Sequence, residues 1–462
     1  MPDCVASPMS AAMSNNGFSK WLARAGIDFH VAVTLLFRSW SIVAGGVMVI
    51  VVPATLAPQE QGYYYTFASL LGLQIFFELG LNQVIVQLVS HELAHLSRGP
   101  DGELIGDKIH LDRLRSIVAL LRKWYAVAAV LFLIVTAAAG GVIFDRTGTL
   151  PRNVWLGPWL ALVTATAFNL YWSPMLSVIE GYGRMGQVAR LRLVQSMVGY
   201  SLVWASLAVG AGLWAVPLIS MTSGLCTAYW LRWRDTPIRL LASAPSVARE
   251  NAIDWRREVL PFQWRIAASW ISGYLIFQLF TPIVFVHLGA VAAGKLGLAL
   301  TVFSSLLSVS VSWINTKIPE MTAHIARGER QPLRETFRSV ATRTAVFTVA
   351  ASAALLLGSA GLRFAGWNAM ERISDLSTLS CIAATTCANI VIYAAAAFMR
   401  SHREEPMLPV SAAGGMAMLL ASYITASQGA FRMMLWQTIV TCMLSLPWTL
   451  MLFRHYYRRS AA

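Results

Sequence analysis

The stretch "AHLSRG" at residues 94–99 recurs in the second half of the chain as "AHIARG" at residues 323–328. Four of the six positions are identical, and the other two exchange similar residues. A second pair, "GYYYTFASLL" from Gly62 and "GLALTVFSSL" from Gly297, is separated by nearly the same length of chain. Paired stretches at an almost constant separation indicate an internal duplication. We therefore expect a fold built from two similar halves.

The composition is that of a membrane protein. Of the 462 residues, 56% are hydrophobic and 13% are charged, whereas soluble domains carry about 25% charged residues. Apolar runs of membrane-spanning length recur between Phe29 and Phe453. These runs predict an all-α, polytopic membrane protein. The five cysteines form no C-x-x-C pair, and we expect no metal site and no cofactor.

The apolar runs predict about twelve transmembrane helices, six in each half. The division between the fifth and sixth spans depends on "AVGAGLWAVP" at residues 208–217. The glycine-rich "EGYGRMG" (Glu180–Gly186) is expected to be a turn after the fourth span, because no strand precedes it as a phosphate-binding loop requires. The expected spans are residues 30–53, 63–89, 122–144, 154–179, 193–210, 213–231, 262–286, 290–316, 340–361, 377–399, 407–427 and 432–453.

The basic residues predict the orientation. Of the 36 lysines and arginines, 29 lie in the terminal segments and the connections on the same side of the membrane. Six lie in the connections on the opposite side, and Arg38 lies within a span. Cytoplasmic segments carry the excess of positive charge, so both termini are expected in the cytoplasm. The net charge of +14 is thus a topological feature, and no nucleic-acid partner is expected.

The halves define the expected domain organisation. Six spans per half give both halves the same orientation, so a pseudo-twofold axis along the membrane normal should relate them. Transporters with this arrangement bind substrate between the halves near the midplane. The expected segments are a cytoplasmic tail (1–29, without a signal peptide), the N-terminal half (30–231), a cytoplasmic linker (232–261), the C-terminal half (262–453) and a cytoplasmic tail (454–462).

One short motif suggests a different class of protein. His91, Glu92 and His95 form H-E-x-x-H, the zinc-ligand and general-base pattern of metalloproteases. An intramembrane zinc metalloprotease is therefore an alternative. The duplication argues against it, because aligning the two copies places His95 on His324 but His91 on Glu320. We expect instead a polar helix end at the membrane surface, repeated in both halves, and no enzymatic activity.

Arginines begin the first span of each half. Arg38 shares a helix face with Ser41 and Gly45, and Arg265 shares one with Ser269 and Ser272. An arginine within a span is costly and marks a cavity or a partner. Two alternatives remain open: Arg265 can extend its side chain to the interface, and Arg38 can form a structural ion pair with Glu78.

Spans two and eight also carry polar residues along one helix face. One stripe combines Gln74, Glu78 and Asn82, and the other combines serines with Asn315. Spans one, two, seven and eight are therefore expected to line a central cleft, although serine stripes also serve helix packing. The predicted substrate-binding residues are Arg38, Arg265, Gln74, Glu78, Asn82, Ser269, Ser308 and Asn315.

The first two spans resemble a known family. "LAPQEQGYY" (Leu56–Tyr64) is similar to the L-x-P-x-E-x-G-x-Y pattern of bacterial polysaccharide flippases, which belong to the multidrug/oligosaccharidyl-lipid/polysaccharide exporter superfamily. "FELGL" (Phe77–Leu81) resembles the acidic-x-Gly segment that ends span two in that family. The 6+6 organisation also agrees with the family over the whole chain.

The resemblance implies a flippase of the bacterial inner membrane. Such proteins move isoprenoid-pyrophosphate-linked oligosaccharide by alternating access, for O-antigen, capsule or exopolysaccharide synthesis. The implied partners are membrane lipid, this substrate and other proteins of polysaccharide assembly. Guanidinium groups match the oxygens of a pyrophosphate, which favours Arg38 and Arg265 as its ligands. The alternative is a cation-coupled drug or metabolite antiporter, but span one lacks a clear carboxylate and a cationic cavity would repel organic cations.

Overall fold

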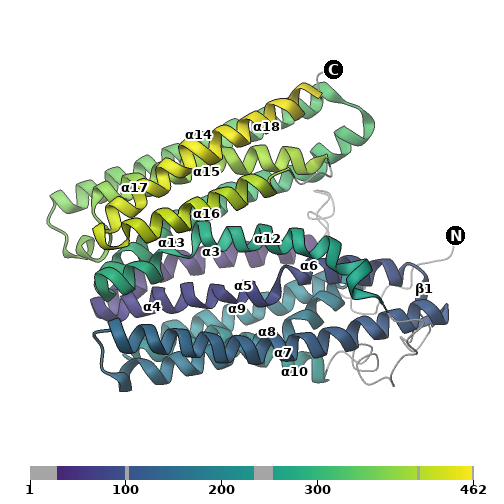
Figure 1. Ribbon diagram of the computed structural model, residues 1–462, viewed down its shortest axis with the longest axis horizontal. Helices are drawn as coiled ribbons and strands as arrows, with labels where there is room; N and C mark the ends of the chain where they lie inside the picture. Colours follow the sequence, from purple (N-terminus) through teal and green to yellow (C-terminus); the bar gives the residue numbers. More distant parts are fainter. Residues whose placement is uncertain (1–28, 99–103, 234–252, 403–405, 460–462) are drawn as a thin grey trace, which may run out of the picture.

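The computed structural model describes residues 29–98, 104–233, 253–402 and 406–459 (Figure 1). The predicted N-terminal tail and most of the predicted linker lie outside these ranges. Nearly all the described residues are helical, and the long helices run side by side along one direction. The chain is therefore an all-α protein, as the composition predicts.

The first half of the chain begins with two long helical segments joined by a short turn at Leu56 and Ala57. The second segment is interrupted twice before a small β-hairpin follows it. Its elements are α3 (Phe29–Thr55), α4 (Pro58–Leu71), η1 (Gly72–Gln74), α5 (Ile75–Glu78), α6 (Leu81–Leu93), β1 (Leu96–Arg98), β2 (Leu104–Gly106), α7 (Lys108–Thr147), α8 (Arg152–Gly181), α9 (Met185–Ala208), η2 (Gly212–Ala215) and α10 (Pro217–Trp233).

The second half repeats this order of long helices without the hairpin. Its elements are η4 (Trp255–Val259), α12 (Leu260–Phe277), α13 (Phe280–Arg327), α14 (Arg330–Phe364), η5 (Asn368–Arg372), α15 (Leu376–Ser401), α16 (Leu408–Thr425), η6 (Ala426–Gln428), α17 (Ala430–Val440), η7 (Thr441–Ser445) and α18 (Leu446–Arg459).

The helices are long and apolar enough to span a membrane many times. Eight of the described helices meet that criterion, or nine when the bent pair Pro58–Glu78 and Leu81–Leu93 is one span. One of the eight, Gln263–Arg327, contains two predicted spans. With α9 and α10, which do not meet the criterion, these helices account for all twelve predicted spans. The chain is a multi-pass membrane protein.

Two spans that we predicted as continuous helices are broken. Span two bends by 41° where Leu79 and Gly80 take left-handed φ values of 50° and 66°. Leu79 is the only residue other than glycine with a positive φ in the described ranges. Span seven breaks between α12 and α13, at Gln278, and Gly289 (φ 85°) then kinks the helix at the predicted end of that span. Broken spans are typical of transporters, where they lie next to substrate.

The duplicated stretch that revealed the repeat has two different structures. In the second copy α13 continues to Arg327 and ends at Gly328, whose left-handed φ of 71° forms the C-cap. In the first copy the helix ends at Leu93, and residues 96–98 pair with residues 104–106 as an antiparallel hairpin. A helix thus ends in or directly before the stretch in both copies, as predicted, but the first copy continues as a β-strand that the sequence did not predict.

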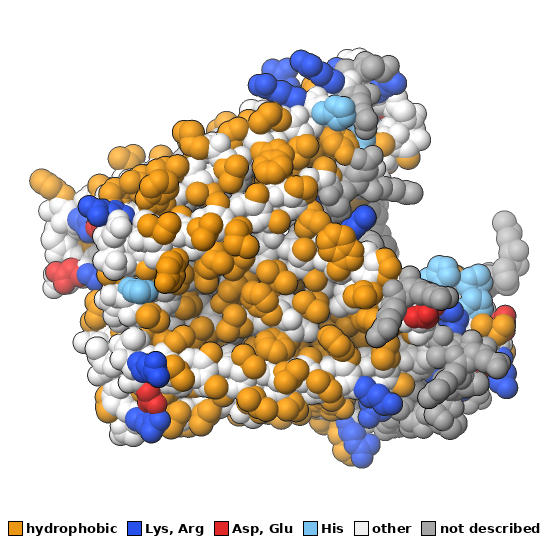
Figure 2. Space-filling view, in the orientation of Figure 1, with side chains coloured by type: hydrophobic (Ala, Val, Ile, Leu, Met, Phe, Trp, Pro, Cys, Tyr) orange, Lys and Arg blue, Asp and Glu red, His pale blue; other side chains and the backbone are white. Residues whose placement is uncertain are grey.

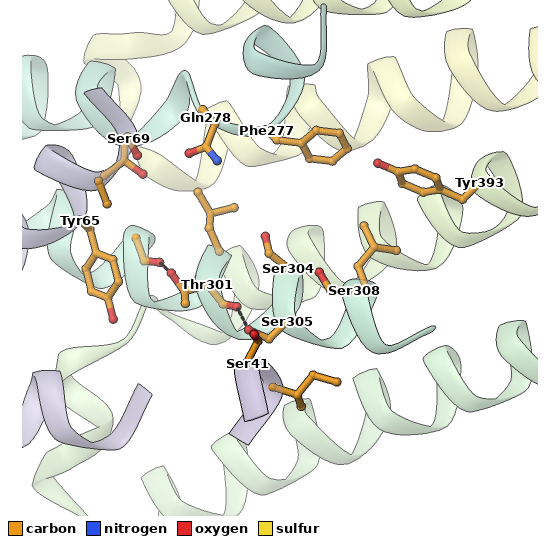
Figure 3. Close-up of a pocket in the computed structure, with 16 residues that line it drawn as sticks. Ser41, Tyr65, Ser69, Phe277, Gln278, Thr301, Ser304, Ser305, Ser308 and Tyr393 are labelled. Atoms are coloured by element: carbon orange, nitrogen blue, oxygen red, sulfur yellow. Dashed lines mark hydrogen bonds between the residues drawn. The ribbon is translucent and has the colours of Figure 1, made fainter. Parts of the chain in front are cut away.

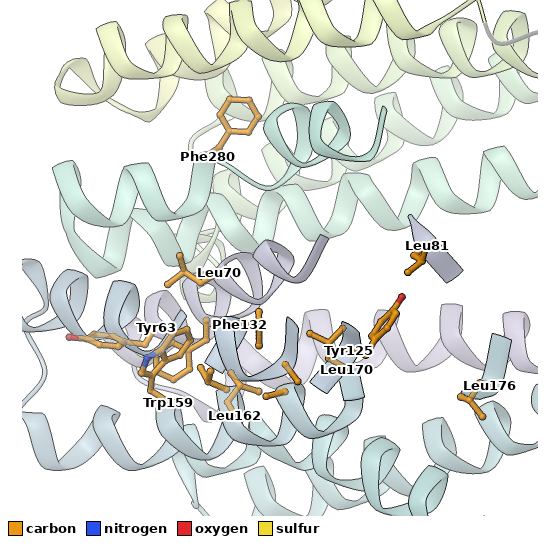
Figure 4. Packing of buried hydrophobic residues seen from close by; sticks show 14 of the residues in the cluster. Tyr63, Leu70, Leu81, Tyr125, Phe132, Trp159, Leu162, Leu170, Leu176 and Phe280 are labelled. Atoms are coloured by element: carbon orange, nitrogen blue, oxygen red, sulfur yellow. The ribbon is translucent and has the colours of Figure 1, made fainter. Parts of the chain in front are cut away.

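The core of the first half is aromatic and surrounds α4. Tyr63, Phe67, Phe144 and Trp159 are fully or almost fully buried, with ring centroids of neighbouring pairs 5.0–6.0 Å apart. Figure 4 shows Tyr63 and Trp159 in this cluster. Gly140 permits the contact, because a Cβ there would lie 2.3 Å from the Trp159 ring. This packing fixes α4 against α7 and α8 and leaves its other face for the second half.

The two ends of the molecule differ. We call the end with the α3–α4 turn the turn end, and the end with β1, β2 and the last turn of α18 the hairpin end (Figure 1). The helices α14–α18 diverge from the first half toward the hairpin end (Figure 1). In the space-filling view the surface is recessed between the two lobes at that end (Figure 2).

Candidate functional site

A cavity of about 590 Å³ lies between the two halves. Its walls come from α3, α4, α12, α13 and α15, so all four spans expected to line the cleft contribute. Figure 3 shows the lining side chains around this space. They are Ser41, Ile42, Tyr65, Ala68, Ser69, Phe277, Gln278, Thr281, Gly297, Leu300, Thr301, Ser304, Ser305, Leu307, Ser308 and Tyr393. The volume is within the range of about 300–1,000 Å³ typical of small-molecule sites.

The lining is polar but uncharged. Ten of its 16 residues carry a hydroxyl or an amide, and none carries a formal charge. The hydroxyls of Ser41, Thr301 and Ser305 each donate to a carbonyl of their own helix at 2.8 Å. A hydroxyl that donates in this way retains lone pairs that accept hydrogen bonds. The cavity therefore presents acceptors, together with the amide donor of Gln278.

Of the eight predicted binding residues, Ser308 lies in the lining. Asn315 is exposed on the same helix, about 10 Å farther toward the hairpin end at 1.5 Å per residue. Ser269 is half-buried on α12 and does not belong to the lining. The serine stripe of span eight thus begins in the cavity and continues out of it.

Arg38 lies just outside the cavity. Its side chain is exposed on α3, one helical turn before Ser41 and Ile42, which both line the cavity. Because residues three and four apart share a helix face, Arg38 lies on the lining face, displaced toward the hairpin end. Of the two predicted arginines, Arg38 is the one that lies on a helix face lining the cavity.

Arg265 has a different position. It is exposed near the start of α12, and its guanidinium carbon lies 5.7 Å from the centroid of the Trp264 ring. Phe277 marks the lining face of α12, and at 100° per residue Arg265 lies about 120° from that face. The structure therefore does not bring Arg265 into the cavity, and an interfacial position agrees with its exposure.

Gln74, Glu78 and Asn82 form a cluster inside the first half. The Gln74 amide donates to one Glu78 oxygen, and Asn82 Nδ2 donates to the other at 3.4 Å. The Tyr125 hydroxyl of α7 donates to Asn82 Oδ1 at 3.1 Å. The cluster lies at the break in span two and none of its members lines the cavity. Within the described residues no ion pair joins Glu78 to Arg38.

The turn end of the cavity is closed by backbone contact between the halves. Gly62 packs directly on Ala290, and a Cβ at Gly62 would lie 1.9 Å from the Ala290 carbonyl oxygen. Gln61 Nε2 donates across the contact to the carbonyls of Gly294 at 2.9 Å and Arg372 at 3.0 Å. Arg372 Nη1 in turn donates to the Leu56 carbonyl at 3.0 Å. Side chains as large as a methyl group are excluded at Gly62.

The hairpin end is joined by a charged cluster around Glu92. Its buried carboxylate accepts from His110 Nδ1 at 2.7 Å and from Arg113 Nε at 3.0 Å. Arg113 also pairs with Glu258, which precedes α12 in the second half. Burial raises the pKa of the Glu92 carboxyl, but the hydrogen bonds from His110 and Arg113 outweigh it, so the pKa lies below its usual value.

This cluster explains what the H-E-x-x-H stretch does in the fold. His91 is exposed, and the His95 ring stacks on His110 with centroids 4.1 Å apart. The Glu92 carboxylate, which a metalloprotease would use as a base, is occupied by His110 and Arg113. Within the described residues, no group of three or more His, Cys, Asp or Glu side chains is arranged to hold a metal ion. The stretch anchors α6 to α7.

Several lining residues escaped the sequence-based prediction. Gln278 gave the clearest signal in the sequence, since it is a single amide in the apolar run "LIFQLFTP" (275–282). In the structure it lies at the break in span seven. Tyr393 belongs to α15, outside the four spans considered. Arg400 lies about 10 Å beyond Tyr393 along α15, on the same helix face and toward the hairpin end.

Comparison with solved structures identifies the fold. The inward-facing conformation of a multidrug resistance MATE family transporter of the MOP superfamily aligns with a TM-score of 0.64 and 13% identity, over 94% of this chain and 99% of that one. Its outward-facing counterpart gives a TM-score of 0.52 with 14% identity, over 92% and 94%. The lipid II flippase MurJ in an inward closed conformation gives 0.57 with 9% identity, over 92% and 87%.

No protein-family model matches the sequence, and no curated protein matches it. The fold and the cavity nevertheless define a polytopic membrane protein with a central cavity between two helical groups. More particularly, the chain has the fold that this MATE family transporter and the lipid II flippase MurJ share.

Proposed function

We propose that the protein is a flippase that moves isoprenoid-pyrophosphate-linked oligosaccharide across the bacterial inner membrane by alternating access. The observation that carries this proposal is the cavity, which is closed at the turn end, rich in hydroxyls and bordered by Arg38 on the other side. The excess of lysine and arginine in the connections supports a cytoplasmic position of the hairpin end, so this state would receive substrate from inside the cell. The MOP fold supports a transport mechanism.

The positions of the polar groups suggest how such a substrate binds. Arg38 of α3 and Arg400 of α15 lie on lining faces toward the hairpin end, where a pyrophosphate would meet two guanidinium groups. The saccharide would then enter the cavity beside Ser308 and Gln278. The isoprenoid chain would stay in the bilayer, because its transfer into a hydroxyl-lined cavity is unfavourable.

A drug antiporter of the same fold would need a different cavity. Organic cations are best held by carboxylates, and the lining contains none. Glu78 is the acidic side chain within span two, but it is bonded to Gln74 and Asn82 inside the first half. Resistance to cationic compounds that depends on Glu78 would favour the antiporter.

The proposal is tested by removing the gene and analysing lipid-linked intermediates and surface glycans. Cells without the protein should accumulate lipid-linked oligosaccharide on the cytoplasmic leaflet and lose surface polysaccharide. The wild-type gene should reverse both changes. An Arg343→Ala variant, which alters an exposed arginine of α14 outside the lining, should reverse them as well. An Arg38→Ala variant at equal expression should not. Normal surface polysaccharide in the deletion strain would contradict the proposed function.

A further inference from the structure

We propose that the saccharide held in the cavity is uncharged, carrying neither carboxylate nor ammonium groups. This inference rests on the proposed function and specifies its substrate. The reason is the contrast between the lining and its border: the 16 lining residues carry no charge, whereas Arg38 lies one turn outside them. The structure thus separates a site for the charged pyrophosphate from a site for the sugars.

The lining offers hydrogen bonds of the kind that sugar hydroxyls make. Ser41, Thr301 and Ser305 present acceptor lone pairs, because their protons are donated to their own helices. Figure 3 shows Gln278 on one side of the space and Ser304 and Ser308 on the other. A sugar hydroxyl both donates and accepts hydrogen bonds, so it can pair with the acceptor hydroxyls of the lining or with the Gln278 amide.

The apolar part of the lining suits the other surface of a sugar ring. Phe277 and Tyr393 face the same end of the space, and Tyr65 lies at the opposite end (Figure 3). Leu300 and Leu307 complete this part of the wall. Aromatic and aliphatic walls with a few polar groups are typical of sites that hold a neutral ligand in a fixed orientation.

A charged sugar would lack a partner in this cavity. A carboxylate transferred from water to a site without a cation loses hydration that neutral hydroxyls only partly replace. The break in span seven supplies no net compensation, because the C-terminus of α12 and the N-terminus of α13 meet there with opposite dipoles. An ammonium group is disfavoured for the same reason, since no carboxylate lines the cavity.

The test compares two probes with the full-length protein in sealed vesicles. The first probe is an isoprenoid pyrophosphate carrying a neutral trihexose, and the second carries the same trisaccharide with one hexose replaced by a hexuronate. Added glycosidase cleaves the saccharide in the outer leaflet, so further cleavage reports movement from the inner leaflet. Wild-type protein should move the neutral probe at least about tenfold faster, which corresponds to 1.4 kcal/mol.

A cation placed in the cavity should reverse this preference. Ser304→Lys and Ser308→Lys should each speed movement of the hexuronate probe relative to the neutral one. The matched control is Thr316→Lys, which adds the same charge at an exposed position of α13 outside the lining and should leave the preference unchanged.

The outcomes separate the two levels of the proposal. Equal movement of both probes by the wild-type protein would overturn the neutral-saccharide inference and leave the flippase intact. Movement of neither probe would overturn both. A preference that is the same in both lysine variants as in the wild type would show that the cavity does not hold the sugars, which overturns the inference.

Discussion

The turn end and the hairpin end hold the two halves together by different means. At the turn end Gly62 and Gly294 bring the backbones into contact, and Gln61 and Arg372 add hydrogen bonds to carbonyls of the facing half. At the hairpin end the segment before α12 is held to α7 by an ion pair between Arg113 and the half-exposed Glu258, by a hydrogen bond from the Ile253 amide to Ser116 Oγ and by a stack of Trp255 on Trp124. Glycine contacts tolerate no added atom, whereas partly exposed ion pairs contribute about 0–1 kcal/mol and weaken in salt.

This difference indicates at which end the surfaces of the two halves must fit each other closely. A transporter with alternating access has to open the turn end, so its closure depends on contacts that separate without leaving a charge buried. The donors of the hydrogen bonds there are a neutral amide and a guanidinium, and the acceptors are backbone carbonyls. When the halves separate, water can take the place of either partner. The hairpin end carries titratable groups instead, so pH and salt should affect it more.

The largest effect is expected from a single added methyl group at the turn end. In Gly62→Ala the new Cβ would lie 1.9 Å from the Ala290 carbonyl oxygen, so the halves cannot close. We expect transport in vesicles to fall at least about tenfold, since overpacking typically costs 1–3 kcal/mol. The control is Gly45→Ala, where nothing lies within 4 Å of the new atom. Equal transport by the two variants would show that this contact does not close the cavity.

A smaller effect is expected when a hydrogen bond between the halves is removed. Arg372→Ala deletes the donor to the Leu56 carbonyl and should weaken closure by about 1–2 kcal/mol. The measurement is labelling of a cysteine introduced in place of Ser305, in the cavity lining, by a reagent added on the side of the turn end; this labelling should become faster. Arg432→Ala is the control, because Arg432 bonds to Gln428 in the same half. Unchanged labelling in Arg372→Ala would contradict the assignment.

At the hairpin end the buried carboxylate should stabilise the first half in a pH-dependent manner. The folded-state pKa of Glu92 is lowered from its ordinary value of 4.5, so its contribution is present above that value and is lost as pH falls through the folded pKa. Glu92→Gln should lower the free energy of unfolding by about 1 kcal/mol at pH 7. Thermal unfolding in detergent should show this difference shrinking below pH 4.5. A difference that is independent of pH would argue against an ionised Glu92.

The smallest effect is expected at the ion pair between the halves. Glu258→Gln removes a partly exposed partner of Arg113 and should change the opening equilibrium by less than about 1 kcal/mol. The change, measured from the distance between spin labels on α6 and α12, should disappear at high salt because screening weakens the wild-type pair. An effect as large as that of Gly62→Ala would remove the distinction between the two ends.

The sequence predicted the spans and four of the five helices around the cavity, because apolar length and polar stripes are local properties. It did not predict the break at Leu79, where a leucine takes a left-handed conformation that its type disfavours. Tyr393 was missed because its place in the lining depends on how α15 packs against α13. The hairpin after Leu93 was missed because strand pairing depends on a partner segment, residues 104–106.

The central claim is that the cavity carries a lipid-linked saccharide from one side of the membrane to the other by closing at the turn end. The most direct test is movement of the neutral trihexose probe in sealed vesicles, followed by its cleavage with added glycosidase. The wild-type protein should expose the inner-leaflet pool to cleavage, and the Gly62→Ala protein should leave that pool protected. A pool that stays protected with the wild-type protein, or that is cleaved equally with both proteins, would contradict the claim.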